Sequence, residues 1–422
     1  MKFTPALFAH AEAALAALLA FEHPADAVLS RYFREHRQLG HADRGFVAET
    51  CFAVLRRLRS LSARCDGDAA PRRLLLAALF CQRGWNLKEL APVARDTDAA
   101  WLAAAKAMKG EDWPAAVRRD LPDWLNERLQ AQFGADTEAL ATALNRPAPL
   151  DLRVNPLKTT REAALARLAA DGIAAEPCAH SPLGIRLDGK PALAKHPLFL
   201  AGDVEVQDEG SQLLGFLVAP KRGEMVADFC AGAGGKTLLL GALMRSTGRL
   251  YALDVSEKRL ANLKPRLARS GLSNVHPLRI ESESDQKVKR LAGKFDRVLV
   301  DAPCSGLGTL RRNPDLKWRQ TPQSVAELTA KQGAILAAAA RLVKPGGRLV
   351  YATCSLLADE NDAVTAAFLA AHPDFSPLAA GDLLGRQEIT LTSGAPAGDG
   401  ALRLLPHAHG SDGFFALAME RA

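Results

Sequence analysis

Four short runs of apolar residues after residue 220 constrain the fold of this chain most strongly. They are MVADF (225–229), RLYAL (249–253), DRVLV (296–300) and RLVYAT (348–353). Such runs are typical of parallel strands that are buried on both faces. Helical stretches separate them, at 236–245, 256–270 and 323–343. This alternation predicts an α/β fold with a mostly parallel, doubly wound, Rossmann-like sheet, whose ligand site lies outside the carboxyl ends of the strands.

The rest of the chain has a different pattern of apolar residues from this region. Because 422 residues exceed what one core usually holds, we expect more than one domain. Residues 1–145 follow the helical period and predict an all-helical domain. Residues 146–215 begin with the alternating strand LDLRV and predict a small α/β domain. The doubly wound domain is then expected over 216–422.

Charge and cysteine usage narrow the class of protein. The net charge of +7 suits a polyanionic partner better than an acidic one. The seven cysteines are scattered and odd in number, which favours free thiols in a reducing compartment, and we expect a cytoplasmic protein. We identify no secretion signal and no run of eighteen apolar residues, so no membrane partner is expected.

A glycine-rich loop, DFCAGAGGKT (228–237), follows the first apolar run and opens a helix. A P-loop would need glycine where Cys230 stands, and the glycine spacing does not match a dinucleotide fingerprint. Asp254 ends the second strand, where a carboxylate can accept hydrogen bonds from ribose hydroxyls. The loop and this acid favour S-adenosylmethionine as the ligand, although an ordinary tight turn and a helix-capping acid remain open alternatives.

Two cysteines stand just beyond the ends of two buried strands. Cys304 follows DAP and Cys354 follows YAT. A free cysteine is most often a small buried hydrophobe, and metal binding is a rival, but no close C-x-x-C pair or histidine spacing supports a metal. A thiolate beside S-adenosylmethionine suits methylation of a pyrimidine at C5, because adding sulfur at C6 gives C5 carbanion character.

These residues also carry a family resemblance. DAPCSGLGTLRRNPDLKW and YATCSLLADEND resemble the two cysteine motifs of the RsmB/NOP-type (Sun/Fmu) RNA (cytosine-5) methyltransferases, and FCAGAGGKT is similar to their cofactor loop. LDLRVNPLKTT resembles their RNA-recognition insert, and EVQDEGSQL (205–213) the stretch leading into their catalytic domain. LRLLPHAHGSDGFFAL (402–417) is similar to their closing segment. HADRGFVAETCFAVLRRL (41–58) resembles the NusB-like, RNA-binding helical domain of bacterial members.

The resemblance implies a role for each matching residue. Cys354 is the implied nucleophile, Cys304 assists release of the methylated base, and Asp301 bonds the exocyclic amine of cytosine. Lys236 stabilises the loop or Asp301. The implied cofactor-binding residues are Cys230, Ala231, Gly232, Ala233, Gly234, Gly235, Lys236, Asp254, Glu281 and Asp301. For the adenine contact, Glu283 is the alternative to Glu281, because RIESESD departs from the family's usual aspartate.

RNA contacts are expected from two basic stretches. Arg311, Arg312, Lys317 and Trp318 lie in RRNPDLKWR beside Cys304, which favours a phosphate clamp over a solvated loop. The end of another predicted helix carries three arginines: Arg56, Arg57 and Arg59. That second cluster is either a solvated last turn or an edge that contacts phosphate.

The sequence therefore predicts an enzyme of class EC 2.1.1 that methylates C5 of cytosine in structured RNA. Ribosomal RNA is the expected substrate and transfer RNA the runner-up. A non-catalytic RNA-binding ribosome-assembly factor with a methyltransferase fold is the alternative from another class. We expect S-adenosyl-L-methionine as cofactor, no metal, and a monomer, although no sequence feature determines the oligomeric state.

Overall fold

The computed structural model describes residues 3–391 and 400–422. Its contacts divide the chain into two compact units. Unit 1 comprises residues 1–147 and 309–322, and unit 2 comprises residues 148–308 and 323–422. The first boundary lies close to the predicted one at residue 145. The regions predicted as separate domains, 146–215 and 216–422, fall together in unit 2, apart from 309–322, so that three-domain division stays a prediction.

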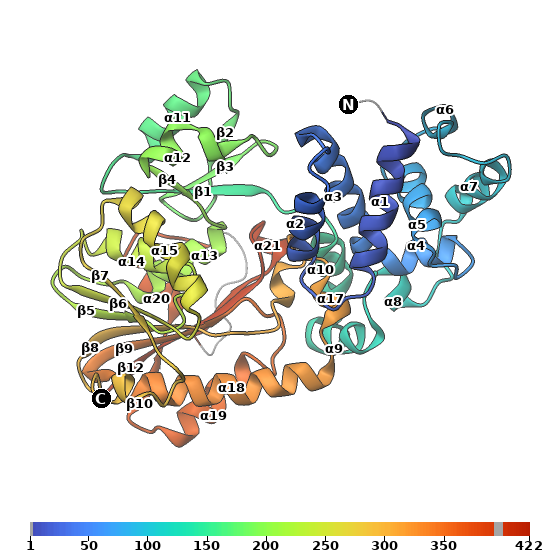
Figure 1. Cartoon of the computed structure of the whole chain (residues 1–422). Helices are drawn as coiled ribbons and strands as arrows, with labels where there is room; N and C mark the ends of the chain where they lie inside the picture. The colour runs from blue at the N-terminus through green and yellow to red at the C-terminus, as the bar shows by residue number, and fades with distance from the viewer. Residues whose placement is uncertain (1–2, 392–399) are drawn as a thin grey trace. The chain divides into compact units, whose positions relative to one another are not determined.

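Unit 1 is helical (Figure 1). Its α-helices are α1 (Pro5–Leu18), α2 (Ala25–Glu35), α3 (His41–Arg56), α4 (Leu58–Arg64), α5 (Pro71–Ala77), α6 (Leu87–Leu90), α7 (Asp98–Ala107), α8 (Ala115–Arg118), α9 (Asp123–Phe133), α10 (Thr137–Leu144) and α17 (Leu316–Arg319), with a π-helical turn at Ala78–Gln82 and a 3-10 turn at Gly134–Asp136. Thr4 caps α1, because its hydroxyl accepts a hydrogen bond from the Leu7 amide at 3.2 Å. Buried leucines of α1, α3 and α5 fill one core.

The second half of the Cys304 motif, from residue 309 onward, packs inside unit 1. Lys317 is 1% exposed, and its ammonium donates to the carbonyl of Arg56 at 2.9 Å and to Asn145 Oδ1 at 2.8 Å. The Trp318 indole donates to the carbonyl of Leu55 at 2.7 Å. Burial lowers the pKa of Lys317 to about 7, with Asp120 opposing that fall. These side chains therefore join the segment to the end of α3.

Unit 2 begins with a four-stranded antiparallel sheet in the order β2–β3–β1–β4. Its elements are β1 (Leu150–Val154), α11 (Arg161–Ala170), β2 (Ala175–Pro177), β3 (Gly184–Leu187), a 3-10 turn (Leu193–Lys195), α12 (Pro197–Ala201) and β4 (Val204–Val206). The predicted strand LDLRV is β1, and Leu152 and Val154 lie in the core of this sheet.

The larger sheet has the order β10–β12–β9–β8–β5–β6–β7, with β11 paired to β12. Its elements and the helices that accompany them are α13 (Glu209–Val218), β5 (Met225–Asp228), α14 (Gly235–Leu243), β6 (Arg249–Asp254), α15 (Glu257–Ser270), β7 (Val275–Arg279), α16 (Gln286–Lys289), β8 (Phe295–Asp301), a 3-10 turn (Leu307–Thr309), α18 (Pro322–Ala340), β9 (Val343–Thr353), α19 (Asp362–Ala371), β10 (Phe375–Leu378), α20 (Ala380–Gly385), β11 (Leu402–Leu404), α21 (Pro406–His409) and β12 (Phe414–Arg421). Strands β5 to β9 pair in parallel, which confirms the predicted doubly wound sheet, while β12 is antiparallel to both β9 and β10.

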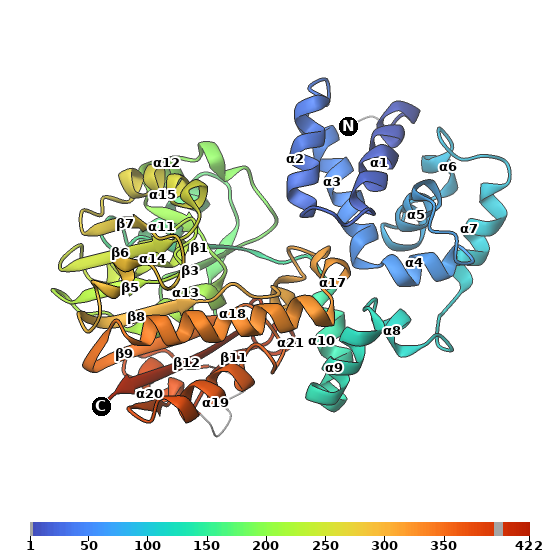
Figure 2. The same cartoon turned by 60° about the horizontal axis from the view of Figure 1, so that its bottom comes forward.

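Helices cover both faces of this sheet (Figure 2). Along β8, Val298 and Val300 pack in the cluster with α18 and α19, whereas Leu299 packs in the cluster with α13, α14 and α20. This two-sided burial explains why the strands read as unbroken apolar runs. The strand order reverses between β5 and β8, so loops diverge there and leave room for a ligand. No helix in the described ranges is both long and apolar enough to span a membrane.

Replacing Lys317 with Ala tests the structural role of the buried segment. We expect a loss of about 2–4 kcal/mol in the free energy of unfolding, because the change leaves a cavity and removes the donor from two buried acceptors. Thermal unfolding monitored by calorimetry gives the measurement, with the exposed Lys88→Ala as control. An unchanged melting temperature together with weaker RNA binding would instead favour the predicted RNA clamp.

Candidate functional site

The carboxyl ends of four neighbouring strands open onto one cavity of about 760 Å³. Asp228 ends β5, Asp254 ends β6 and Asp301 ends β8, and all three line the cavity. Cys354, the residue after β9, and Cys304, three residues after β8, line it as well. The cavity therefore lies outside the carboxyl ends of the strands, where the sequence predicts a ligand site, and at the point where the strand order reverses.

The glycine-rich loop between β5 and α14 forms one wall of the cavity. Its lining residues are Cys230, Ala231, Gly232, Ala233, Gly235 and Lys236. Gly234 does not line the cavity. Its φ is 82°, and a Cβ there would stand 2.1 Å from Leu263 Cδ1 of α15, so this position requires glycine for the turn and for close packing.

Two arginines, of which Arg153 is buried and Arg266 is partly buried, hold this loop from outside. Arg153 of β1 donates to the carbonyl of Gly235 at 2.7 Å and also bonds Gln207 Oε1. Arg266 of α15 donates to the carbonyl of Ala233 at 2.7 Å and pairs with Glu205 at 3.0 Å. The small antiparallel sheet thus fixes the backbone of the loop that faces the cavity.

Asp254 is 5% exposed and is fixed by two backbone amides. Its Oδ2 accepts from the amide of Gly232 at 2.8 Å, and its Oδ1 accepts from the amide of Ser256 at 2.7 Å. Each carboxylate oxygen retains further acceptor capacity. The arrangement suits recognition of a diol such as a ribose.

Lys236 and Asp301 form an ion pair inside the cavity, with Nζ and Oδ2 2.8 Å apart. Burial alone would lower the pKa of Lys236, but the attraction of Asp301 outweighs it, and a negative charge on Cys354 would add to it, so the pKa is raised. Lys236 therefore carries its positive charge at neutral pH, beside both Asp301 and Cys354.

The two cysteines are in contact, with their Sγ atoms 3.3 Å apart. The hydrogen bond with Cys354, then burial, raise the pKa of Cys304 well above its usual value. Cys304 therefore remains a protonated thiol at neutral pH, in hydrogen-bond contact with Cys354.

One buried carboxylate connects the loops that carry these cysteines. Glu360 is fully buried, and its Oε1 accepts from the amide of Ser305 at 2.8 Å and from Gln332 Nε2 at 3.0 Å. Its Oε2 accepts from the Ser305 hydroxyl at 2.5 Å and from the Ser355 hydroxyl. Ser305 and Ser355 each follow one of the cysteines, so Glu360 fixes both loops at once.

Backbone contacts tighten the same region. The amide of Gly308 donates to the carbonyl of Cys354 at 2.8 Å, and the amide of Gly413 donates to the carbonyl of Gly308 at 2.8 Å. A Cβ on Gly308 would stand 2.2 Å from the carbonyl oxygen of Gly413. Glycine at this position therefore lets three backbone segments meet beside Cys354.

The structure also shows where the remaining predicted residues lie. Glu283 lines the cavity, whereas Glu281 is exposed and does not, so the structure favours the alternative over the first choice. Arg311 and Lys317 are buried in unit 1, and Arg312 and Trp318 are partly buried there. Within the described ranges, no group of three or more His, Cys, Asp or Glu side chains is arranged to hold a metal ion.

Several cavity residues were not singled out from the sequence. Gln207 and Ser211 line the cavity from the EVQDEGSQL stretch, and Arg259 of α15 and Lys331 of α18 add positive charge. Asp228 was missed as well, although it ends its strand as Asp254 and Asp301 do. That shared position was the sequence signal that could have revealed it.

Asp228 is 1% exposed, and its Oδ2 accepts from the Thr237 hydroxyl at 2.7 Å. Its Oδ1 is buried and has no hydrogen-bond partner among the described residues. Burial and the neighbouring Asp301 raise the pKa of Asp228 to about 7, against the opposing Thr237 bond. A buried polar atom with spare capacity on the wall of the cavity fits a site built for a polar ligand.

Replacing Asp228 with Asn tests this carboxyl. Its folded-state pKa exceeds the unfolded value of about 3.9, so the native protein binds the extra proton and loses stability as pH rises from about 4 to about 7. The Asn variant lacks this loss. Relative to the unmodified protein, we expect it to gain on the order of 2 kcal/mol between about pH 5 and about pH 8. Melting temperatures of the cofactor-free proteins give the comparison, and parallel pH profiles would contradict the assignment.

Comparison with known proteins agrees with this geometry. Residues 215–420 match the family described as "16S rRNA methyltransferase RsmB/F", and residues 121–194 match its ferredoxin-like domain. The chain is 35% identical to a probable ribosomal RNA small subunit methyltransferase B of Synechocystis, over 94% of this chain and 95% of the relative. It is 34% identical to the ribosomal RNA small subunit methyltransferase B of Sodalis glossinidius, over 90% of each chain.

Solved structures show the same fold. The crystal structure of PH0851 has a TM-score of 0.78 and 25% identity, and the match covers all of both chains. A methyltransferase homologue from Pyrococcus horikoshii has a TM-score of 0.63 and 30% identity, over 73% of this chain and 97% of its own. The family resemblance, the methyltransferase fold and the S-adenosylmethionine cofactor expected from the sequence are thereby confirmed, and the chain belongs to the RsmB/F family of 16S ribosomal RNA methyltransferases.

Proposed function

We propose that this enzyme methylates C5 of a cytosine in 16S ribosomal RNA through a covalent bond between Cys354 and the base. The observation that carries the proposal is the contact of Cys304 and Cys354, 3.3 Å apart, in the same cavity as the glycine loop and Asp254. Neither thiol is placed as an inert core residue, because both line the cavity.

S-adenosylmethionine supplies an electrophilic methyl group when it is bound. The residues present fit this cofactor: the loop 230–236 offers backbone amides, Asp254 suits the ribose, and the unsatisfied oxygen of Asp228 offers an acceptor. Glu283 is the proposed acid for the adenine region, in place of Glu281, because only Glu283 lines the cavity.

Cys354 acts as the nucleophile in this proposal. Its thiolate forms a bond to C6, the C5–C6 double bond opens, and C5 gains the electron density it needs to take the methyl group. Water, acting as the base, then takes the proton from C5, the C5–H electron pair restores the C5–C6 double bond, and the C6–sulfur electron pair leaves with Cys354 as a thiolate. Lys236, paired with Asp301, brings a positive charge to the cavity that Cys354 also lines.

Two further residues assist this reaction: Cys304 in release of the base and Asp301 in its recognition. The thiol of Cys304 is in hydrogen-bond contact with Cys354 before attack, and at the end it assists release of the base from Cys354. Asp301, held by Lys236, can accept a hydrogen bond from the exocyclic amine of cytosine. A carboxylate acceptor there favours cytosine, whose amine is a donor, over uracil, which carries a carbonyl at that position.

Glu360 is a positioning residue for both cysteines. It does not line the cavity, yet its carboxylate fixes Ser305 and Ser355 beside them. Displacing either sulfur by about 1 Å is enough to cost on the order of 100-fold in rate. Loss of the Glu360 carboxylate is therefore expected to slow the chemical step and to leave cofactor binding unchanged.

The proposal extends to the RNA substrate, the cellular location and the oligomeric state of the enzyme. Ribosomal RNA is favoured over transfer RNA by the family match. A monomer in the cytoplasm is part of the same proposal. Turnover of tritiated cofactor on unmodified 16S ribosomal RNA, with transfer RNA in parallel, tests the substrate. RNA binding without any turnover would favour the assembly-factor alternative.

Exchanging each cysteine for alanine separates their roles. Cys354→Ala is expected to abolish methyl transfer and to leave cofactor affinity within about 2-fold, because the loop and Asp254 remain. Cys304→Ala is expected to accumulate a protein–RNA adduct that survives a denaturing gel, since release from Cys354 is slowed. Cys51→Ala, a buried cysteine of unit 1, serves as the control. An adduct with Cys354→Ala but not with Cys304→Ala would reverse the assignment.

Changes at Glu360 test its positioning role. Glu360→Ala is expected to lower kcat about 100-fold while the Kd for the cofactor stays within about 2-fold. Glu360→Gln keeps an acceptor for the Ser305 amide and Gln332, so it is expected to restore most of the rate. A loss shared equally by the cofactor Kd, or no rescue by Gln, would exclude a role confined to holding the cysteine loops.

A further inference from the structure

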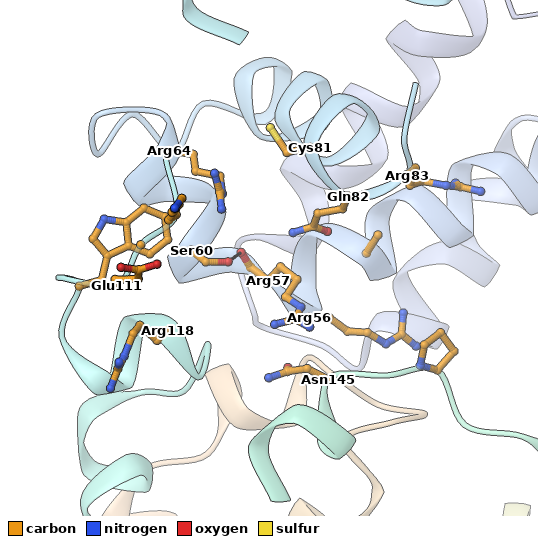
Figure 3. A pocket seen from close by; sticks show the side chains of 15 residues that line it. Arg56, Arg57, Ser60, Arg64, Cys81, Gln82, Arg83, Glu111, Arg118 and Asn145 are labelled. Atoms are coloured by element: carbon orange, nitrogen blue, oxygen red, sulfur yellow. Dashed lines mark hydrogen bonds between the residues drawn. The ribbon is translucent and has the colours of Figure 1, made fainter. Parts of the chain in front are cut away.

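Unit 1 contains a second cavity, of about 620 Å³, that the proposed catalytic mechanism does not use (Figure 3). Its lining residues come from the end of α3, from α4, from the π-helical turn, from the loop before α8 and from α8 itself. Figure 3 shows Arg57 in the middle of the cavity wall, with Arg64 and Arg118 on two sides of it.

The cavity is strongly basic. Six of its 15 lining residues are cationic, and Glu111 is the one acidic residue among them; the cations are Arg56, Arg57, Arg64, Arg83, Lys109 and Arg118. Two carboxylates outside the lining pair with them: Asp120 with Arg57 at 3.5 Å, and Glu49 with Arg83 at 3.1 Å. Positive charge therefore remains in excess.

The basic groups divide into fixed and available ones. The Arg64 guanidinium donates to the carbonyl of Met108 at 2.7 Å, and the Arg56 guanidinium donates to the carbonyl of Arg311 at 2.9 Å, which fixes both. Lys109 and Arg118 are exposed and form no ion pair or side-chain hydrogen bond within the described residues. They are free to meet an anion that enters the cavity.

Arg56, which lines the cavity, carries one unsatisfied donor. Its Nε is buried and has no hydrogen-bond partner among the described residues. Burial lowers the pKa of Arg56 to about 10. A phosphate oxygen would satisfy such a donor.

An aromatic ring lies among these charges. Trp113 lines the cavity, and the Arg64 guanidinium stands 5.2 Å from the centre of its ring. The ring packs so closely on Gly110 that a Cβ there would stand 2.6 Å from it. Guanidinium groups for phosphate, together with a fixed aromatic face, are the combination that holds unpaired nucleotides.

We propose that this cavity is a second RNA site, which binds the phosphates of an unpaired stretch of the ribosomal RNA substrate. The inference rests on the proposed function and extends it to where the substrate is held. The three arginines that the sequence analysis treated as one cluster differ in whether they line this cavity. Arg56 and Arg57 line the cavity, whereas Arg59 pairs with Asp123 at 2.6 Å and does not.

The test compares full-length variants for binding of a fluorescently labelled single-stranded RNA across a salt titration. Lys109→Gln combined with Arg118→Gln is expected to weaken binding about 10-fold and to lower the slope of log K against log salt by about 1.4. Lys88→Gln combined with Arg95→Gln removes the same charge from exposed residues of unit 1 outside the cavity and is expected to leave both unchanged. Glu111→Gln is expected to tighten binding about 3-fold, because it removes the acid from the lining.

Other outcomes would overturn the proposal. Equal effects of the cavity pair and the control pair would show a general charge effect. Weaker binding of inorganic phosphate with unchanged RNA affinity would show a small-anion site instead. Methyl transfer by the unmodified protein is measured in parallel with tritiated cofactor, so failure of the proposed function is seen there and not in the binding comparison. Melting temperatures of all variants confirm that the exposed substitutions leave the fold intact.

Discussion

The chemistry proposed for this enzyme depends on one buried carboxylate. Glu360 stands behind the cavity and accepts hydrogen bonds from both residues that follow the two cysteines. The same two loops also meet through the Ser305 and Ser355 hydroxyls, 3.2 Å apart, and through the backbone contact at Gly308. A buried charge is costly unless it is fully bonded, and here four donors satisfy it. The hydrogen bonds to Glu360 fix the two loops, and the loops in turn hold the two sulfur atoms at a fixed distance from each other.

The sequence predicted the features that depend on regular patterns. Strands buried on both faces produced the apolar runs at β5, β6, β8 and β9, and their carboxyl ends therefore carried Asp254, Asp301 and Cys354 to one cavity. The contact between Cys304 and Cys354 could be expected for the same reason, because parallel neighbours end at the same edge of the sheet. Local pattern and topology agree in this part of the chain.

Features that depend on tertiary packing were not predictable in the same way. Lys317 and Trp318 read as a basic, aromatic RNA contact, but the sequence does not record that both would bond backbone carbonyls of α3, with Lys317 buried. Glu360 was quoted within a motif and given no role, since its partners Ser305 and Gln332 are distant in sequence. Glu281 and Glu283 differ by two residues in a loop, and only the fold decides that Glu283 faces the cavity.

The central claim is that the Cys354 sulfur bonds transiently to C6 of the target base. Ribosomal RNA carrying 5-fluorocytosine tests it directly in the unmodified enzyme, because fluorine cannot leave C5 as a proton does and the adduct persists after methyl transfer. Peptide mapping by mass spectrometry then locates the modified nucleotide. The account predicts the adduct on the peptide that contains Cys354. An adduct on the Cys304 peptide, or methylated product without any adduct, would contradict it.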